Sequence, residues 1–282
     1  MAQIKVSVIN ASSVLSDAEV QGAVPALQMQ VSRDFAPVWG IDADLDFVPK
    51  AQAQSAPADR WWLVILDNSD QAGALGYHDM TTKGLPLGKV FAATDLEYGN
   101  KWTVTASHEL LEMLGDPAIN LTALWMTAFD VSQNVVGRLY AYEVCDPCES
   151  DGDGYPINGV LVSDFVYPSW FEAFWQAGTT QFDYQKKITA PFQLLPGGYI
   201  TVYDMTSGTG WQQISVPLPA AGSAARAPVG SRRERRRTPR NQWLRSSPTS
   251  ASSFGAAPML QSAPREKQPP AKGKATRGKS RG

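Results

Sequence analysis

Residues 107–117, which read Ser-His-Glu-Leu-Leu-Glu-Met-Leu-Gly-Asp-Pro, have the residue types and spacing best suited to chemistry. They include His108, one of only two histidines in the 282 residues. His108 and Glu112 are four positions apart, so on a helix they lie on the same face, one turn from each other. Glu109 lies about 100° further round the helix. This spacing is typical of a helix that binds zinc through His108 and Glu112 and uses Glu109 to accept a proton from water.

A catalytic zinc ion needs a third protein ligand in addition to water. The downstream segment Tyr-Glu-Val-Cys-Asp-Pro-Cys-Glu offers two candidates, Glu143 and Asp146. Asp146 has a second possible role, because it could accept the free ring N–H of His108 and fix the tautomer of that imidazole. Asp116 is the rival third ligand, since the glycine before it would let the chain turn back toward the ion. We favour Glu143 or Asp146, because aspartate followed by proline is also typical of a helix end.

This ligand set predicts hydrolysis of peptide bonds. The zinc ion would lower the pKa of its water, and Glu109 would take the proton and later pass it to the leaving amine. The reaction also needs a group that stabilises the oxyanion, and His78, Tyr155 and Tyr167 are candidates among which the sequence does not choose. A predicted strand at 90–93, just before the helix, could offer its edge to an extended peptide.

A histidine and a glutamate four residues apart also occur on ordinary solvated helix faces, so context decides between the two interpretations. The predicted helix carries four apolar residues that would bury one side, which leaves its polar residues on a defined face: Leu110, Leu111, Met113 and Leu114. The other histidine, His78, has no spaced partner, which favours a structural or supporting role over that of a ligand.

The elements that must position these residues follow from apolar periodicity and from turn signals. Strands are expected at 4–9, 45–48, 61–66 and 88–93. A capped helix should run from Ser16 to about Val38, with a possible kink at Pro25. The helix that carries His108 should span about 103–114 and be followed by a strand-rich part, with strands at 138–144, 159–166, 199–204 and 211–216 and a short helical stretch around 170–175.

These expectations describe an α/β (α+β) fold with a mixed twisted sheet, a metal-binding helix and a strand-rich C-terminal part. We expect one domain over residues 1–216, followed by a disordered tail over 217–282. The tail is rich in Ala, Pro, Arg and Lys and has only isolated apolar residues, so it cannot bury enough surface to offset its chain entropy.

The sign of the net charge changes at about the same position as the amino-acid composition. Residues 221–282 hold 15 Lys and Arg against 2 acidic residues, whereas residues 1–220 hold 10 against 25. Basic clusters such as 232–237 predict non-specific contacts with nucleic acid or another polyanion through phosphates. A role in solubility, or docking on the acidic body of the same chain, is the alternative.

Two cysteines, Cys145 and Cys148, are too few for a disulfide scaffold, and they could form a small disulfide or stay reduced. No secretory signal and no apolar run long enough to cross a membrane is seen in the sequence. A cytoplasmic protein without membrane partners is therefore the default expectation.

The order of strands and helices leading into the His108 helix resembles that of the zincin metallopeptidases. Ser-His-Glu-Leu-Leu-Glu followed by Gly-Asp-Pro, with Glu143, Asp146 and Cys148 downstream, also resembles the HExxE proteins related to the plant phosphate-induced (Exordium-like) group. The resemblance covers about residues 60–170. It implies a zincin-like fold, with zinc bound by His108 and Glu112 and with Glu109 as the base. A glutamate in place of the usual second histidine makes the ion a poorer Lewis acid, so the alternative is an inactive zincin-fold binding protein whose tail contacts nucleic acid or a partner assembly.

Overall fold

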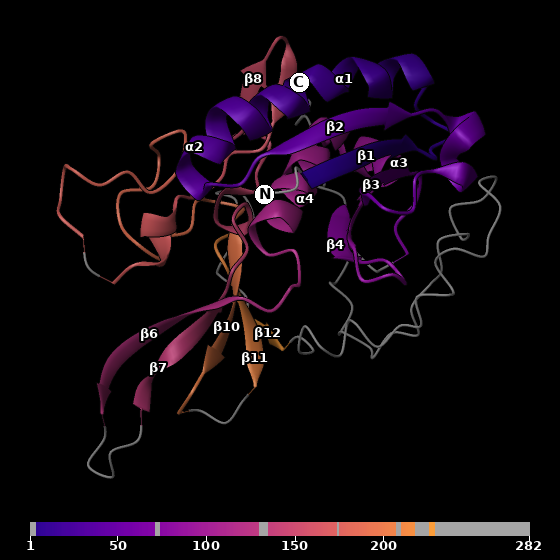
Figure 1. Cartoon of the computed structure of the whole chain (residues 1–282). Helices are drawn as coiled ribbons and strands as arrows, with labels where there is room; N and C mark the ends of the chain where they lie inside the picture. The colour runs from indigo at the N-terminus through magenta and orange to yellow at the C-terminus, as the bar shows by residue number, and fades with distance from the viewer. Residues whose placement is uncertain are drawn as a thin grey trace, which may run out of the picture.

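The structure is a computed structural model that describes residues 4–70, 74–129, 135–173, 175–206, 210–217 and 226–228. Its described residues form a mixed α/β fold with two five-stranded sheets and a two-stranded sheet. The expected α+β class is thus confirmed. Figure 1 shows the first sheet under the long N-terminal helix, with the strands of the second sheet extending below it.

The first sheet, which we call sheet A, has the strand order β2-β1-β3-β5-β4. Its strands are β1 (Ile4–Asn10), β2 (Ala43–Val48), β3 (Trp61–Leu66), β4 (Gly76–Met80) and β5 (Pro86–Phe91). The pairings are parallel except for the last one, in which β4 runs antiparallel to β5. Strand β5 is paired on both sides, so the expectation that it offers a free edge is wrong. The edge of sheet A beside it is β4.

The N-terminal helix follows its cap signals. Helix α1 (Asp17–Met29) begins after Ser16, whose side chain forms a capping box with Glu19. The chain continues helically through a π-helical segment, η1 (Gln30–Phe35), and a short helix, α2 (Ala36–Trp39). The helix accommodates Pro25, and its departure from α geometry lies at η1 instead.

Both faces of sheet A are covered. On β3, Leu63 and Ile65 belong to the main core cluster, which also contains buried side chains of α1 and of the later helix α4 (Trp102–Gly115). The alternate residues Val64 and Leu66 join a smaller cluster on the opposite face. Because the side chains on both faces of β3 are buried, its sequence is a continuous run of apolar residues.

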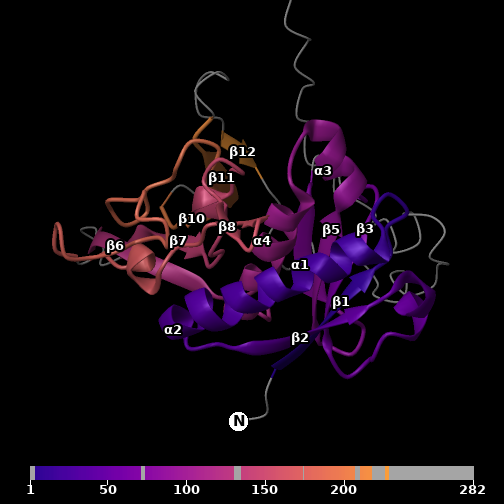
Figure 2. The same ribbon diagram turned by 90° about the horizontal axis from the view of Figure 1, so that it is seen from above.

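Two consecutive helices connect sheet A to the second sheet. Helix α3 (Ala92–Tyr98) follows β5 directly, and its first two residues fall within the strand predicted at 88–93. It ends at Gly99, whose φ of 78° lies in the left-handed region that glycine adopts without strain. Helix α4 agrees with the predicted helix within one residue at each end. Figure 2 shows both helices beside the strands of sheet A.

The second sheet, sheet B, is antiparallel in the order β12-β11-β10-β7-β6. Its strands are β6 (Thr122–Phe129), β7 (Val135–Ala141), β10 (Tyr199–Asp204), β11 (Trp211–Ser215) and β12 (Arg226–Pro228). Between β7 and β10 lie four short elements: η3 (Asp146–Cys148), β8 (Tyr155–Ile157), β9 (Val160–Val162) and η4 (Pro168–Phe171). A further 3-10 turn, η2 (Lys50–Ser55), precedes β3.

The elements predicted for the C-terminal part of the chain agree with the structure only in part. Strand β10 matches its predicted range, whereas the strand predicted at 159–166 shortens to β9, and the predicted helical stretch near 170 is the 3-10 turn η4. Within the predicted disordered tail, Arg226–Pro228 form β12 and pair with β11, so the prediction is wrong for these three residues. The rest of the tail beyond residue 217 lies outside the described residues.

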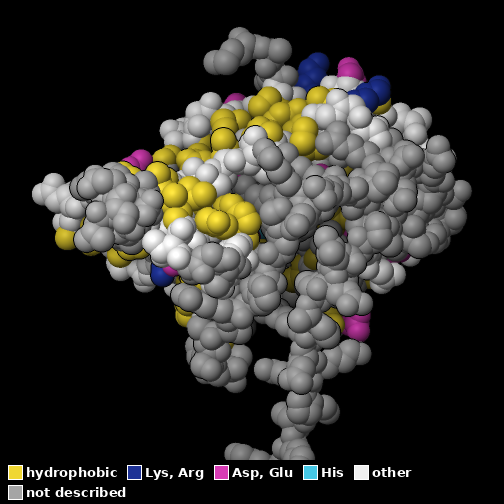
Figure 3. Space-filling model, turned by 90° about the horizontal axis from the view of Figure 1, so that it is seen from below, with side chains coloured by type: hydrophobic (Ala, Val, Ile, Leu, Met, Phe, Trp, Pro, Cys, Tyr) yellow, Lys and Arg dark blue, Asp and Glu magenta, His cyan; other side chains and the backbone are white. Residues whose placement is uncertain are grey.

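The main core is continuous between the two sheets, because it contains Tyr140, Ile200 and Val202 of sheet B together with residues of sheet A. From below, hydrophobic side chains gather in a band on the surface, and no histidine is visible among the described side chains of that face (Figure 3). No helix among the described residues is long and apolar enough to span a membrane.

Candidate metal centre

Helix α4 carries the predicted site and is buried over most of its length. Its apolar residues Leu110, Leu111 and Leu114 lie in the main core, as the sequence predicts. The polar residues are buried as well: His108, Glu109 and Glu112 are 3–7% exposed. Buried charges are costly unless they are paired or bind a cation. The polar face of α4 is therefore part of an internal site and not a solvated surface.

His108, Glu112 and Asp146 form the first group that could hold a metal ion. The Nε2 atom of His108 lies 3.3 Å from Oε1 of Glu112 and 3.3 Å from Oδ1 of Asp146. Asp146 begins the 3-10 turn η3, which lies next to α4 although it is far along the chain. Of the downstream candidates, Asp146 is thus the one next to His108.

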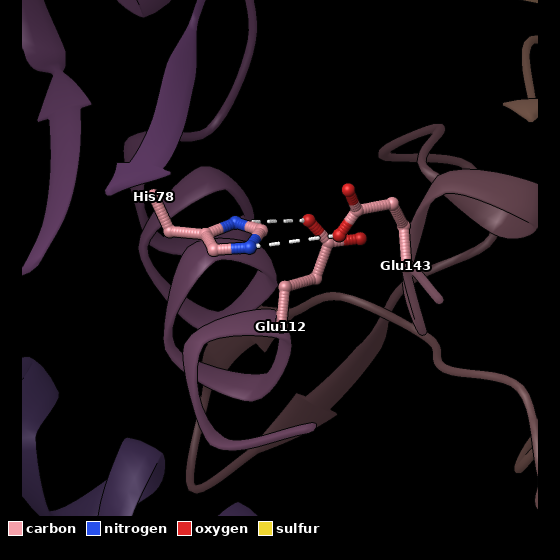
Figure 4. A group of neighbouring side chains, drawn as sticks. All are labelled: His78, Glu112 and Glu143. Atoms are coloured by element: carbon pink, nitrogen blue, oxygen red, sulfur yellow. Dashed lines mark ion pairs between the residues drawn. The ribbon is translucent and has the colours of Figure 1, made fainter. Parts of the chain in front are cut away.

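His78, Glu112 and Glu143 form a second group. Figure 4 shows the imidazole of His78 extending from β4 toward the two carboxylates. Its Nδ1 atom lies 3.4 Å from Oε2 of Glu112, and its Nε2 atom lies 3.5 Å from Oε2 of Glu143. Glu143 is therefore a neighbour of His78, and Glu112 belongs to both groups.

The place of His78 follows from the antiparallel pairing of β4 with β5. Gly76 and His78 alternate onto the face of sheet A that packs against α4. A Cβ atom on Gly76 would lie 2.7 Å from Oε1 of Glu109 and 2.7 Å from Cγ2 of Thr105, so the glycine allows the strand to approach the helix. The sequence favours a structural or supporting role for His78, and the structure places its imidazole within the cluster. The alternation Gly-x-His was the signal available in the sequence.

Two backbone amides orient Glu112. The N–H groups of Cys145 and Asp146 donate to its Oε1 atom, at 3.1 and 3.3 Å. Its Oε2 atom faces His78 instead. Burial favours the neutral acid, but the charges and hydrogen bonds of His108 and His78 outweigh burial and lower the pKa of Glu112. Glu112 is therefore held as a carboxylate with one oxygen toward each imidazole.

Glu109 lies between the helix and β4. Its Oε2 atom is 3.5 Å from Nδ1 of His78 and accepts no hydrogen bond from the described residues. Burial raises the pKa of Glu109, against the influence of the neighbouring imidazoles His78 and His108. A buried carboxylate with a raised pKa and a free oxygen is suited to accept a proton near neutral pH.

The other members of the cluster are also perturbed by burial and by their neighbours. Burial and the negative charge of Glu112 raise the pKa of Asp146 to about 7. Burial disfavours the imidazolium form of His78, but Glu109 and Glu112 outweigh it and raise the pKa of His78 to about 9. Strongly shifted pKa values in one cluster are typical of functional sites.

The donors fit a divalent cation. Imidazole nitrogens and carboxylate oxygens are the ligands that zinc and other first-row divalent ions accept. The Nε2 atom of His78 is buried and makes no hydrogen bond within the described part of the chain, although it lies in a polar cluster. A bound cation would satisfy such an atom. The described residues thus form groups in which a metal ion can be held.

The rival ligand Asp116 has a local role in the structure. Its two carboxylate oxygens accept the backbone N–H groups of Asn120 and Leu121, each at 3.0 Å. This side chain closes the turn after α4, as the aspartate-proline signal indicates.

Of the three candidates for stabilising an oxyanion, only His78 is in contact with the cluster residues. Tyr155 donates instead to Oδ2 of Asp34, at 3.0 Å, and Tyr167 stacks with Phe165. The sequence interpretation missed another tyrosine, Tyr199 of β10, which is close enough to Asp146 for each side chain to influence the pKa of the other. No motif marks Tyr199, because sheet pairing alone brings β10 to this place.

Cys145 and Cys148, which flank Asp146, are both free and buried. Burial raises the pKa of both thiols, which disfavours the reactive thiolate form. The pair therefore packs into the core beside the cluster. Comparisons of the chain with protein-family models, with curated proteins and with solved structures found no match.

Proposed function

We propose that the protein is a metal-dependent hydrolase that cleaves peptide bonds, with zinc as its resident ion. One observation carries the proposal. His108, Glu109 and Glu112 of a single buried helix meet Asp146, Glu143 and His78 from elsewhere in the chain, and both possible ligand groups include Glu112. This is the combination of ligands and a general base that metal-assisted hydrolysis requires.

The resemblance to zincin metallopeptidases supports the same reaction class. It rests on the HExxE motif and on the order of elements, and it agrees with a mixed sheet against which α4 packs. In this interpretation His108, Glu112 and Asp146 are the zinc ligands. Glu143 takes a supporting place beside His78, 3.5 Å from its ring.

The proposed chemistry assigns a role to each side chain. A bound divalent ion supplies Lewis-acid polarisation and lowers the pKa of water. Glu109 accepts the water proton at Oε2, which accepts no hydrogen bond from the described residues, and then donates it to the leaving amine. The imidazole of His78, 3.5 Å from that oxygen, orients the carboxylate and can donate a hydrogen bond to the developing oxyanion.

A peptide substrate is supported by the position of β4. This strand forms one edge of sheet A and carries His78. An extended peptide can add to such an edge through main-chain hydrogen bonds, with alternate side chains facing the protein. The scissile bond would then lie next to the cluster, because every second residue of β4 faces α4.

The decisive test is the variant Glu109→Gln, with Glu97→Gln as its control. Both changes remove one carboxylate, but Glu97 is an exposed residue of α3 outside the cluster. We expect Glu109→Gln to retain zinc and to lose peptidase activity by about 10²–10⁴-fold, as is usual for loss of a general base. Zinc content by elemental analysis and cleavage of a quenched-fluorescent peptide library would measure the two effects.

Three results would contradict the proposal: no zinc in the wild-type protein after reconstitution, no peptide cleavage by any zinc-loaded preparation, or equal activity of wild type and Glu109→Gln. Retained zinc without cleavage would favour the inactive zincin-fold binding protein. A glutamate ligand, which adds negative charge next to the ion, gives a physical reason for such a loss of activity.

A second candidate function comes from the charge distribution. We propose that residues 221–282, with 15 basic and 2 acidic side chains, bind nucleic acid or another polyanion without sequence preference. The affinity for a fluorescent duplex DNA should fall as salt rises, and it should be lost on deletion of 229–282, a change that keeps β12. Salt-independent binding, or binding that survives the deletion, would rule out this role of the tail.

A further inference from the structure

The two ligand groups share one residue but not one oxygen. Glu112 directs Oε1 toward His108 and Oε2 toward His78. Each group then has one imidazole and one further carboxylate of its own, Asp146 in the first and Glu143 in the second. We propose that the centre binds two divalent cations, one in each group, with Glu112 as the carboxylate common to both. The proposal rests on the function proposed above and adds a second ion to it.

The separation of the two imidazoles is the first argument. Among the described residues, no group with all ligand atoms within 4.8 Å of one another contains both histidines. One ion bound by His108, Glu112 and Asp146 therefore leaves His78 outside its ligand set. The side chain of His78 is only 6% exposed, and its Nε2 atom makes no hydrogen bond in the described chain. A second cation would give this buried nitrogen a partner.

Charge balance is the second argument. The cluster contains four buried carboxylates, and two imidazoles that are neutral when they bind metal: Glu109, Glu112, Glu143 and Asp146, with His78 and His108. With one divalent ion, one negative charge stays in excess when His78 is protonated and two when it is neutral, whereas two ions neutralise all four carboxylates. Because uncompensated charge is costly in a low-dielectric interior, two ions are favoured over one.

The positions differ in the elements that form them. The first joins α4 to the turn η3, whereas the second joins α4 to the edge strand β4 and to Glu143, which follows β7. A single substitution can thus remove one position and leave the other. With one nitrogen and several oxygen donors each, both positions suit first-row divalent ions such as Zn²⁺ and Mn²⁺. Pairs of such ions occur in aminopeptidases and phosphatases, which places the centre in the two-metal hydrolase class.

The test is a metal count on the full chain. Protein stripped with a chelator would be titrated with Zn²⁺, dialysed and analysed for zinc per chain. We expect two zinc ions in the wild type and in the control Glu97→Gln, and one in His78→Gln and in Glu143→Gln. The variant His108→Gln should also keep one, bound at the His78 position. Far-UV circular dichroism would verify that each variant is folded, and either His78→Gln or Glu143→Gln suffices for the comparison.

Electron paramagnetic resonance of the Mn²⁺-loaded protein gives a readout that does not depend on counting. Two Mn²⁺ ions that share a carboxylate should be magnetically coupled. The wild type should therefore show a coupled spectrum, and His78→Gln should show the six-line spectrum of an isolated Mn²⁺ ion. A six-line spectrum in the fully loaded wild type would overturn the proposal.

The outcomes separate this inference from the proposed function. One ion per chain in both the wild type and His78→Gln would overturn the second position and leave the single-ion hydrolase intact. Two ions in both would show that His78 binds neither. No ion in the wild type would overturn both proposals together.

Discussion

At the residue scale, Glu112 makes contacts that a histidine at the same position could not all make. Its Oε1 atom accepts two backbone N–H groups, from Cys145 and Asp146, while its two oxygens also face two different imidazoles. A neutral histidine offers only one acceptor nitrogen. It could not satisfy both amides and also remain a ligand. A carboxylate at this position can thus accept the N–H groups of Cys145 and Asp146 and still face both imidazoles.

A buried carboxyl pair away from the metal centre leads to a prediction about pH. Asp164 and Asp183 are both fully buried. Oδ1 of Asp164 accepts the backbone N–H groups of Phe165 and Gln185, at 2.8 and 3.2 Å, whereas its Oδ2 atom has no donor in the described chain. Burial, together with the hydrogen bond and negative charge of Asp183, raises the pKa of Asp164 to about 9. The native protein therefore holds a proton on Asp164 at neutral pH.

The sign of the pH effect follows from the two pKa values of Asp164. Between the unfolded value of 3.8 and the native value of about 9, the native state binds the extra proton. Stability must then fall as pH rises through this window, by at most about 1.4 kcal/mol per pH unit. The variant Asp164→Asn, which resembles the protonated form, should lose this part of the slope. Urea unfolding at pH 6, 7 and 8 would measure it, and equal slopes in the two proteins would contradict the assignment.

At the scale of elements, the contact of β4 with α4 decides the position of His78. A Cβ on Gly76 would meet Glu109 and Thr105 at 2.7 Å, so Gly76→Ala must push the strand away from the helix. We expect this variant to destabilise the fold by about 1–3 kcal/mol, which is typical of overpacking. It should also weaken zinc binding, because His78 moves with the strand.

Gly22→Ala is the matched control for this prediction. Gly22 is an exposed residue of α1, with nothing within 4 Å of an added Cβ. The change should stabilise the protein by about 0.5–1 kcal/mol, since alanine is the better helix former. Chemical denaturation and zinc titration of both variants would compare them. If Gly76→Ala were as stable as Gly22→Ala and bound zinc as tightly as the wild type, the close approach of β4 would not matter.

At the scale of the whole molecule, the candidate ligands connect parts that are distant in the sequence. His78 comes from the edge of sheet A, Glu112 from α4, and Asp146 from the segment that leads out of sheet B. A bound ion would therefore hold both sheets to the same helix. Ions that bind only the native state stabilise it by mass action.

Metal removal should accordingly lower the thermal stability. At free zinc 100-fold above Kd, each bound ion contributes about 2.7 kcal/mol, which corresponds to about 5–10 °C in Tm for a protein of this size. Calorimetry of the full chain with zinc and with a chelator would measure the shift, and His108→Gln should reduce it. An unchanged Tm on chelation, in protein shown to lose its zinc, would contradict a structural coupling.

The sequence by itself determined the elements whose signals are local. Buried strands such as β3 show as apolar runs, and β10 is found at its predicted range. Helix α4 and the capping box at Ser16 follow from side-chain spacing of three or four residues, which a helix makes into contacts. The grouping of His108, Glu109 and Glu112 on one polar face needed no more than this spacing, whereas the choice of Asp146 over Glu143 as the neighbour of His108 came from the tertiary structure.

Only the tertiary structure decided the rest of the site. Strand β4 lacks a strong apolar pattern, because it lies at an edge and turns Gly76 and His78 toward polar residues of α4. Its pairing with β5 nevertheless brings His78 to Glu112, 34 positions away in the sequence. Tyr199 reaches Asp146 in the same way, through the pairing of strands in sheet B. Contacts between residues so far apart depend on sheet order and packing, which short-range periodicity does not encode.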